Sequence, residues 1–392
     1  MGSSRRYGDM ERVAIVHDWL VAWRGGERVL AALHRIWPQA PVYTLIADPR
    51  LLARHLPDAQ VWVSPLQRWP GAQRYFRWLL PLFPYWVEGW DLSGYDLIVS
   101  SSHCVAKGVI PEPDALHVCY IHTPMRYVWD RRFEYWGHGL RYRLLEYAFL
   151  HRLRRWDTVS AARVDLFIAN SRFVARRVQK YYGRPALVLY PPIRIDFFRP
   201  ADVPPEHFLV VSALVPYKRI EVVIEAFRAF PRIPLVVVGD GPLRRSLRRR
   251  SPSNVVWRGR VSDEELRDLY QRAYAVLLPG VEDFGMVVAE AHACGRPAIV
   301  GPRGGACEVV EPDVTGIVLP EVSVPALQAA IDRVLTGCFN RDAIRARVEM
   351  LGEVAFRERF QSIVQWAWTR FRAGRAPDEE LRLLGRFPQV VD

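Results

Sequence analysis

The chain has 392 residues, a formal net charge of +12 at pH 7 and a hydrophobic content of 50%. This length is too great for one compact core and suits two domains, and the composition excludes a disordered or collagen-like protein. No segment approaches the ~20 apolar residues that cross a bilayer, because the longest candidate, residues 78–87, contains two prolines. The polar residues 1–9 lack the pattern of a signal peptide, so we expect a cytoplasmic protein.

The cysteines and lysines are few. The five cysteines are odd in number and have no spacing typical of a zinc site, so we expect scattered reduced thiols and neither a metal nor a disulfide. Only Lys107, Lys180 and Lys218 are lysines among 54 basic residues. A lysine retained in such an arginine-rich chain marks a position where a compact ammonium is useful.

Short apolar runs rich in β-branched residues alternate with longer amphipathic stretches. Continuous apolar runs predict strands buried on both faces, as in parallel sheets covered by helices. A first series comprises residues 13–16, 96–99, 117–121, 165–168 and 187–189, and a second comprises 208–211, 235–238, 255–257, 275–278, 298–300 and 316–318. The pattern predicts two doubly wound α/β domains.

A proline-rich connector, residues 190–200, separates the two series, and its prolines favour extended backbone. We therefore expect an N-terminal domain over 1–195, a second domain over 196–360, and a C-terminal helical segment, 361–392, that packs back on the first. Ser262 with Glu265 predicts a capping box, and Ser171 predicts the cap of a helix over 173–182.

Residues 282–290 carry the sharpest chemical pattern, directly after the predicted strand 275–278. Gly285 permits close approach of a ligand to the backbone, and the helix that follows offers unpaired amides to a phosphate. Glu290, well inside that helix, is placed to bind a polyol such as ribose. Glu282 lies in the loop, nearer the group attached to the phosphate. Taken alone, the pattern fits equally a strand-to-helix turn with two solvated glutamates.

Other motifs of the second half also follow predicted strands. Lys218 comes after 208–211, the turn that starts at Gly239 comes after 235–238, and the Gly304-Gly305 pair comes after 298–300. Open α/β sheets bind ligands at the carboxyl ends of their strands, so the second half is predicted to hold a nucleotide-diphosphate site.

With these motifs the sequence resembles the retaining family 4 glycosyltransferases of GT-B fold, especially bacterial mannosyltransferases of O-antigen and exopolysaccharide assembly. The resemblance rests on residues 25–27, 120–124, 126–130, the 191–200 connector and the motifs above. It implies two Rossmann-like parallel-sheet domains that face a central cleft. It also implies a nucleotide diphosphate sugar as donor substrate, with GDP-mannose the first expectation, no cofactor and no metal.

The resemblance assigns roles to individual residues. His122, Glu282 and Lys218 would act at the reacting sugar and diphosphate, and Glu290 would bind the ribose. The other donor contacts would come from Arg219, Gly239, Phe284, Gly285, Met286 and Val287. The family usually has an arginine five residues before the lysine, whereas this chain has Ala213, so Arg219 is a candidate replacement for that charge.

Candidates for the acceptor side lie in the first half. Gly25, Gly26 and Glu27 open an amphipathic stretch over 27–37, although an ordinary glycine turn explains them too. His122 follows a predicted strand end, where a structural role is the alternative. Lys107, Arg126 and Asp130 complete the acceptor-side set.

Residues 66–90 mix aromatic side chains with arginines. Such a segment suits a membrane interface that contains anionic lipid, and an internal helix pair that packs its rings in the core is the alternative. With a polyprenyl-linked or other glycan as acceptor, this predicts peripheral attachment to the inner face of the cell membrane.

Competing classes have less support. After the predicted strands there is no G-x-G-x-x-G for a nicotinamide enzyme and no P-loop for an NTPase. A nucleic-acid-binding protein would explain the charge of +12, but no recognition motif accompanies it, so no nucleic-acid partner is expected. Transfer from UDP-glucose, a UDP-hexosamine or GDP-fucose, and a nucleotide-sugar epimerase of the same architecture, remain alternatives.

Overall fold

The computed structural model describes residues 10, 12–137 and 139–383. Their contacts form two compact units. Unit 1 contains the described residues up to Tyr190 and those from Phe356 onward, and unit 2 contains Pro191–Ala355. The connector belongs to unit 2, because Ile193 forms a parallel bridge with Gly352. The units therefore part at 190 and 355, a few residues before the boundaries expected at 195 and 360.

Unit 1 is built on a seven-stranded parallel sheet with the order β3-β2-β1-β4-β5-β6-β7. The strands are β1 (Val13–His17), β2 (Val42–Thr44), β3 (Val61–Val63), β4 (Leu97–Ser102), β5 (Leu116–Ile121), β6 (Leu166–Ala169) and β7 (Leu187–Val188). The five predicted strands are all present. β2 and β3, which lie at one end of the sheet, were not predicted.

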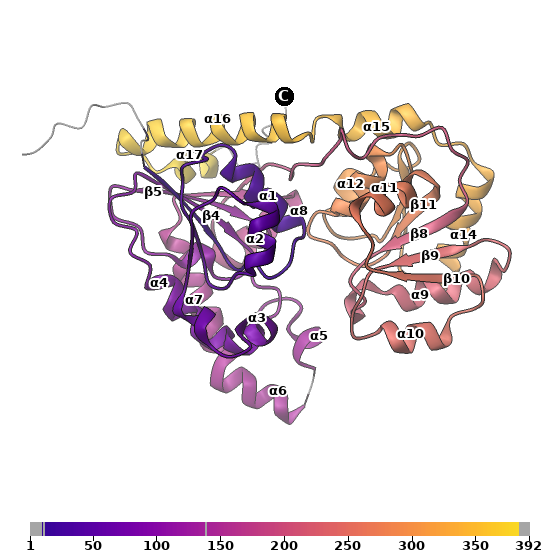
Figure 1. Ribbon diagram of the computed structural model, residues 1–392, viewed down its shortest axis with the longest axis horizontal. Coiled ribbons are helices and arrows are strands. Elements are labelled where there is room, and N and C mark those ends of the chain that lie inside the picture. The colour runs from indigo at the N-terminus through magenta and orange to yellow at the C-terminus, as the bar shows by residue number, and fades with distance from the viewer. Residues whose placement is uncertain (1–9, 11, 138, 384–392) are drawn as a thin grey trace, which may run out of the picture. The chain divides into compact units, whose positions relative to one another are not determined.

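Helices cover both faces of this sheet (Figure 1). Successive residues of β1 point to opposite faces of the sheet. Ile15 packs in a cluster with α1 and α16, whereas Val16 packs in a cluster with residues of the 66–90 segment. The helices of unit 1 are α1 (Gly25–His34), α2 (Pro49–His55), α3 (Ala72–Tyr75), α4 (Phe83–Glu88), α5 (Arg132–Trp136), α6 (Leu140–Leu145), α7 (His151–Ser160), α8 (Arg172–Tyr182), α16 (Glu353–Arg372) and α17 (Pro377–Leu383).

The 66–90 segment divides its aromatic side chains between core and surface. Phe76 and Phe83 are buried with Leu80 in the core beneath the sheet. Trp78 is 84% exposed and Tyr85 is 73% exposed. Phe76 and Phe83 therefore pack in the core, as the internal-helix alternative expects, whereas Trp78 and Tyr85 lie on the surface.

Unit 2 has a six-stranded parallel sheet with the order β10-β9-β8-β11-β12-β13, which is the strand order of the doubly wound nucleotide-binding fold. Its strands are β8 (His207–Val211), β9 (Leu235–Val238), β10 (Val255–Gly259), β11 (Ala273–Leu278), β12 (Ala298–Val300) and β13 (Gly316–Val318). All six were predicted. The predicted fold class of two doubly wound parallel sheets is thus confirmed.

The helices of unit 2 are α9 (Ile220–Ala226), α10 (Arg244–Arg250), α11 (Asp263–Gln271), α12 (Met286–Ala293), α13 (Ala306–Val309), α14 (Val324–Thr336) and α15 (Arg341–Glu349). The predicted N-cap serines are present in both units, and Ser262 supplies the serine half of the predicted capping box. The Ser262 hydroxyl accepts from the Glu265 amide at 3.1 Å, and that of Ser171 accepts from the Val174 amide at 3.0 Å. Within the described part of the chain, no helix is both long enough and apolar enough to span a membrane.

Candidate functional site

The donor motifs of unit 2 meet where the strand order reverses. β8 and β11 are neighbours in the sheet, and the loops after them carry Lys218 and Glu282. The two side chains form an ion pair, with Lys218 8% exposed and Glu282 22% exposed. Two groups that lie 64 positions apart in the sequence are thus brought together at the carboxyl edge of the sheet, where such folds bind ligands.

Two glycines allow these loops to close on each other. Gly285, immediately before α12, has a φ of +97°, and a Cβ there would lie 2.8 Å from the Ala306 Cβ. A Cβ on Gly280 would lie 2.6 Å from the Lys218 Cα. Any larger residue would therefore strain or push apart the segments that hold the ion pair.

α12 begins directly after Gly285 and supplies the backbone end of the site. Phe284 is buried, whereas Met286 and Val287 in the first turn are half-buried. The first amides of a helix have no partner inside it, and the positive end of the helix dipole favours an anion. The arrangement provides what a diphosphate requires beside the Lys218 ammonium.

Glu290 lies on the second turn of α12 and is buried. Its Oε2 accepts a hydrogen bond of 2.9 Å from the hydroxyl of Tyr270, which is also fully buried. Tyr270, a residue that the sequence analysis did not single out, orients the carboxylate assigned to the ribose. The only available signal was its place in the apolar pattern of α11, which is equally typical of a core residue.

Arg219 does not accompany Lys218. Its backbone is left-handed, with φ of 55°, and its guanidinium pairs with Glu221 at 2.8 Å on the surface. Ala213, where the family carries an arginine, is exposed. The adjacent cations thus point to different carboxylates, and the structure does not bring Arg219 to the Lys218–Glu282 pair.

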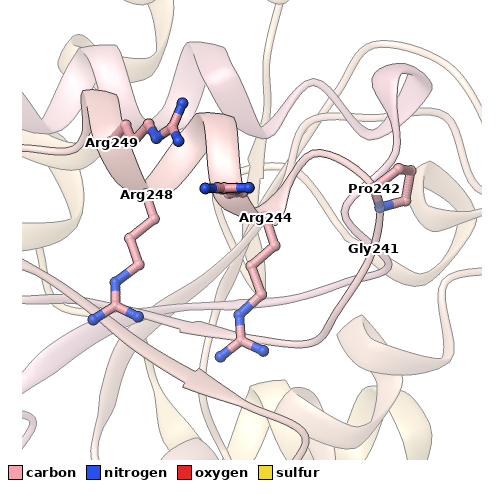
Figure 2. Close-up of a pocket in the computed structure, with 6 residues that line it drawn as sticks. Gly241, Pro242, Arg244, Arg248 and Arg249 are labelled. Atoms are coloured by element: carbon pink, nitrogen blue, oxygen red, sulfur yellow. The ribbon is translucent and has the colours of Figure 1, made fainter.

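A second cationic feature follows β9. Gly239 begins the turn after this strand, and the turn leads into a pocket of about 560 Å³ lined by Gly241, Pro242 and arginines of α10. Figure 2 shows Arg244 and Arg248, four residues apart, with their guanidinium groups extended in the same direction. Arg244 lies 3.8 Å from Asp240. The pocket offers planar, charged donors suited to an oxyanion.

In unit 1, His122 lies just beyond the end of β5. Its Nε2 is 2.9 Å from the Ser101 hydroxyl, and Ser101 also lies 3.1 Å from Nδ1 of His17. The start of α1 faces the same ring, since a Cβ on Gly26 would lie 3.7 Å from the His122 Nε2. The structure therefore brings His122 and the Gly25-Gly26 turn together at the carboxyl edge of this sheet.

An ion pair between buried Asp18 and half-buried His103, whose ring lies 6.3 Å from that of His122, was missed by the sequence analysis. Asp18 is fully buried and accepts four backbone N–H groups, from residues 103–106, as well as the imidazole Nδ1 of His103 at 3.0 Å. Asp18 raises the pKa of His103 against the opposing effect of burial, while His103 holds the pKa of Asp18 well below its usual range. Both residues directly follow strand ends, which was the signal available.

The remaining acceptor-side candidates have different surroundings. Glu27 is buried in the first turn of α1, where burial raises its pKa. Arg126 is half-buried and lies close enough to His103 to oppose its protonation. Asp130 forms a 2.6 Å ion pair with Arg177.

Lys107 corrects our expectation. It is 1% exposed, its ammonium lies 3.0 Å from the Asp157 carboxylate, and it donates to the Ser160 hydroxyl at 2.6 Å. A buried ammonium needs such partners, and these bonds hold it in the interior of unit 1. These contacts favour a structural role for Lys107.

The described residues contain no group of three or more His, Cys, Asp or Glu side chains that could hold a metal ion. All five cysteines are free thiols. What both units do offer are cationic and hydrogen-bonding groups at the carboxyl edges of parallel sheets. These features define a two-unit α/β protein with groups suited to an anionic ligand.

Comparisons with known proteins identify the family. A model described as Glycosyltransferase Family 4 matches residues 15–197, and one described as Glycosyl transferases group 1 matches residues 194–348. D-inositol 3-phosphate glycosyltransferases of Mycobacterium tuberculosis and Mycobacterium bovis are 29% identical over 199 residues, which is 44% of this chain. That match spans 42% of the length of these relatives.

Solved structures agree on the fold. HepE of Anabaena, in complex with UDP-glucose, is 18% identical with a TM-score of 0.69, and the match covers 90% of this chain and 99% of HepE. Sucrose-phosphate synthase of Thermosynechococcus elongatus is 18% identical with a TM-score of 0.71, and the match covers 92% and 100% of the two chains. The chain belongs to the family 4 glycosyltransferases and has the GT-B fold.

Proposed function

We propose that the protein is a retaining glycosyltransferase that transfers a hexose from a nucleotide diphosphate sugar to a glycan or polyprenyl-linked acceptor in surface polysaccharide synthesis. The observation that carries the proposal is the Lys218–Glu282 pair beside the start of α12. An ammonium and the free amides of a helix start are the groups needed to bind a leaving diphosphate.

In the proposed reaction, the bond between the anomeric carbon and the diphosphate oxygen breaks while the acceptor hydroxyl bonds to that carbon on the same face. The acceptor proton passes to the departing phosphate oxygen. Lys218 and the α12 amides stabilise the charge that develops on the diphosphate, which is the main catalytic contribution. Glu282 would bind the sugar, and His122 would donate or accept a hydrogen bond beside it.

The ion pair has a consequence for substrate binding. Without donor, Lys218 and Glu282 neutralise each other. A diphosphate that binds Lys218 competes with Glu282 for the ammonium and releases the carboxylate toward the sugar hydroxyls. Binding of the phosphate and orientation of the sugar are therefore coupled through these two side chains.

GDP-mannose is our first choice of donor, on the resemblance to bacterial mannosyltransferases. UDP-glucose is the principal alternative, because the structurally similar HepE was crystallised with it. Residues that contact the base and the sugar hydroxyls distinguish these donors. Donor choice is therefore the first property to measure.

The test incubates the protein with each of four donors: GDP-mannose, UDP-glucose, UDP-N-acetylglucosamine and GDP-fucose. ³¹P NMR then measures the release of nucleoside diphosphate. We expect one donor to be consumed by the wild type and not by Lys218→Ala, and the product to retain the anomeric configuration. Consumption of no donor would refute the proposal. Conversion of the sugar without release of the diphosphate would indicate an epimerase instead.

A further inference from the structure

Ser101, at the carboxyl end of β4, links two histidine rings. Its hydroxyl lies 2.9 Å from Nε2 of His122 and 3.1 Å from Nδ1 of His17. Ser101 and His17 are fully buried, and they are paired in register between β4 and β1. The serine is therefore held by the sheet itself, and its hydroxyl orients the one ring assigned to the reacting sugar.

The number of hydrogen atoms restricts this chain of bonds. A serine hydroxyl has one hydrogen to donate, and a neutral imidazole has one N–H donor and one bare nitrogen acceptor. If Ser101 donates to His122, then His17 must donate to Ser101, and both rings carry their hydrogen on Nδ1. If Ser101 donates to His17 instead, both rings carry it on Nε2. In a third arrangement Ser101 accepts from both rings, but its own buried hydrogen then has no acceptor, because the two rings are the partners of this hydroxyl among the described residues. Ser101 therefore donates to one of the rings, and the nitrogen that accepts from it carries no hydrogen.

His17 decides between the two arrangements. Burial lowers its pKa to about 4, so the ring is neutral at neutral pH. Its Nε2 is buried and has no hydrogen-bond partner among the described residues. Hydrogen on Nε2 would leave a buried N–H donor unpaired, which is the rarer situation in proteins. Hydrogen on Nδ1 leaves only a bare acceptor there and satisfies Ser101.

We propose that Ser101 and His17 are positioning residues that hold His122 in the neutral Nδ1–H tautomer, with its Nε2 as the acceptor of the Ser101 hydroxyl. The inference rests on the proposed function for the role of His122, but the tautomer itself does not. The Ser101 hydroxyl also fixes the orientation of the ring, which already packs edge-to-face on Tyr120 at 5.2 Å.

The chain contains a matched control on the same strand. Ser100 is also fully buried, and its hydroxyl lies 2.8 Å from Nε2 of His117. Nδ1 of His117 lies 3.1 Å from the carbonyl of Arg163. Because a carbonyl only accepts, His117 carries its hydrogen on Nδ1. Ser100→Ala thus removes the same kind of bond from a buried histidine with no proposed role in the reaction.

The experiment compares Ser101→Ala, Ser101→Thr and Ser100→Ala in the full chain. Tautomers are read from ¹⁵N histidine NMR, and the His122 signals are assigned by their loss in His122→Gln. We expect Nδ1–H for His122 in the wild type and in Ser101→Thr, which keeps the hydroxyl. In Ser101→Ala we expect His122 to populate the Nε2–H tautomer. In Ser100→Ala we expect the His122 tautomer to be the same as in the wild type.

Kinetics supply the second measurement. Ser101→Ala should lower kcat by about 10- to 100-fold, by analogy with removal of the outer hydrogen-bond partner of a metal-ligating histidine, with the donor KM changed less than kcat. Ser101→Thr should recover most of kcat, and Ser100→Ala should leave it near that of the wild type. An Nε2–H tautomer of His122 in the wild type, or equal kcat in Ser101→Ala and Ser100→Ala, would overturn the proposal.

The two measurements separate this inference from the proposed function. If the wild type consumes no nucleotide sugar, the proposed function fails while the tautomer of His122 can still be read. If the wild type is active and His122 has the other tautomer, only the positioning role of Ser101 and His17 is refuted.

Discussion

Replacement of Lys218 by alanine tests the donor site most directly. Lys218 is nearly buried and has its ammonium on Glu282, so a diphosphate bound there gains a charge-assisted contact that bulk water does not weaken. Such contacts contribute about 1.5 to 3 kcal/mol, and a tenfold change in affinity corresponds to about 1.4 kcal/mol. We therefore expect Lys218→Ala to weaken binding of the nucleoside diphosphate by roughly 10- to 150-fold.

The ion pair predicts an opposite effect for its other member. Glu282→Gln removes the charge that competes with the diphosphate for Lys218, and a partly exposed pair is worth up to about 1 kcal/mol. The free nucleoside diphosphate should then bind up to about fivefold more tightly, whereas sugar transfer should slow because the carboxylate is lost. If Glu282 were simply a binding residue, its loss would weaken both nucleoside diphosphate binding and sugar transfer.

Isothermal titration calorimetry with GDP and with UDP measures these affinities, and thermal unfolding checks that each variant is folded. Arg219→Ala is the matched control, because it removes the neighbouring cation, whose partner in the structure is Glu221. We expect it to change the affinity less than twofold. Unchanged affinity in a folded Lys218→Ala would refute the donor site, and a large loss in Arg219→Ala would show that Arg219 replaces the arginine absent at Ala213.

Four further outcomes are expected. Glu290→Ala should weaken nucleoside diphosphate binding by about 1.5 to 3 kcal/mol in calorimetry, and unchanged affinity would contradict the ribose contact. Activity should survive EDTA, because Lys218 and the α12 amides supply the positive charge; loss that magnesium or manganese restores would contradict this. Vesicles of anionic lipid should sediment the protein at low salt and less at high salt, and a folded Trp78→Ser, Arg77→Ser variant should bind less; equal binding would remove the membrane role of residues 66–90. Between pH 6.5 and 5 the free energy of unfolding should fall by about 1.6 kcal/mol for each buried histidine of pKa about 4, such as His117, because the unfolded chain binds protons that the folded ring does not. Denaturant unfolding at both pH values measures this change, and a constant free energy would contradict it.

The sequence by itself was sufficient for the architecture and for the donor motif. Burial on both faces makes a strand continuously apolar, so eleven strands of the two sheets could be predicted from their own residues, as could the caps at Ser171 and Ser262. The glycine before α12 and the glutamate within it are also local signals, because the backbone of a strand-to-helix turn depends on the residues in that turn. β2 and β3 were not predicted, and the residues of β3 are not buried on both faces as the pattern requires.

The partners of the charged and polar side chains were decided by the tertiary structure. Lys107 and Lys218 look equivalent in sequence, since both are rare lysines near a strand end. The fold places Asp157 against the first, 50 positions away, and Glu282 against the second, 64 positions away. One partner is inside unit 1 and the other is at a sheet edge, so the surroundings favour a structural role for Lys107 and the proposed ligand role for Lys218.

The same reason explains the pairs that the sequence analysis missed. Asp18 meets His103 across 85 positions, and His17 meets Ser101 across 84. Parallel strands align their carboxyl ends at one edge, so residues that follow different strands become neighbours only when the strand order and register are set. Composition and spacing identify which residues stand at strand ends, whereas the packing of the sheet selects which of them touch.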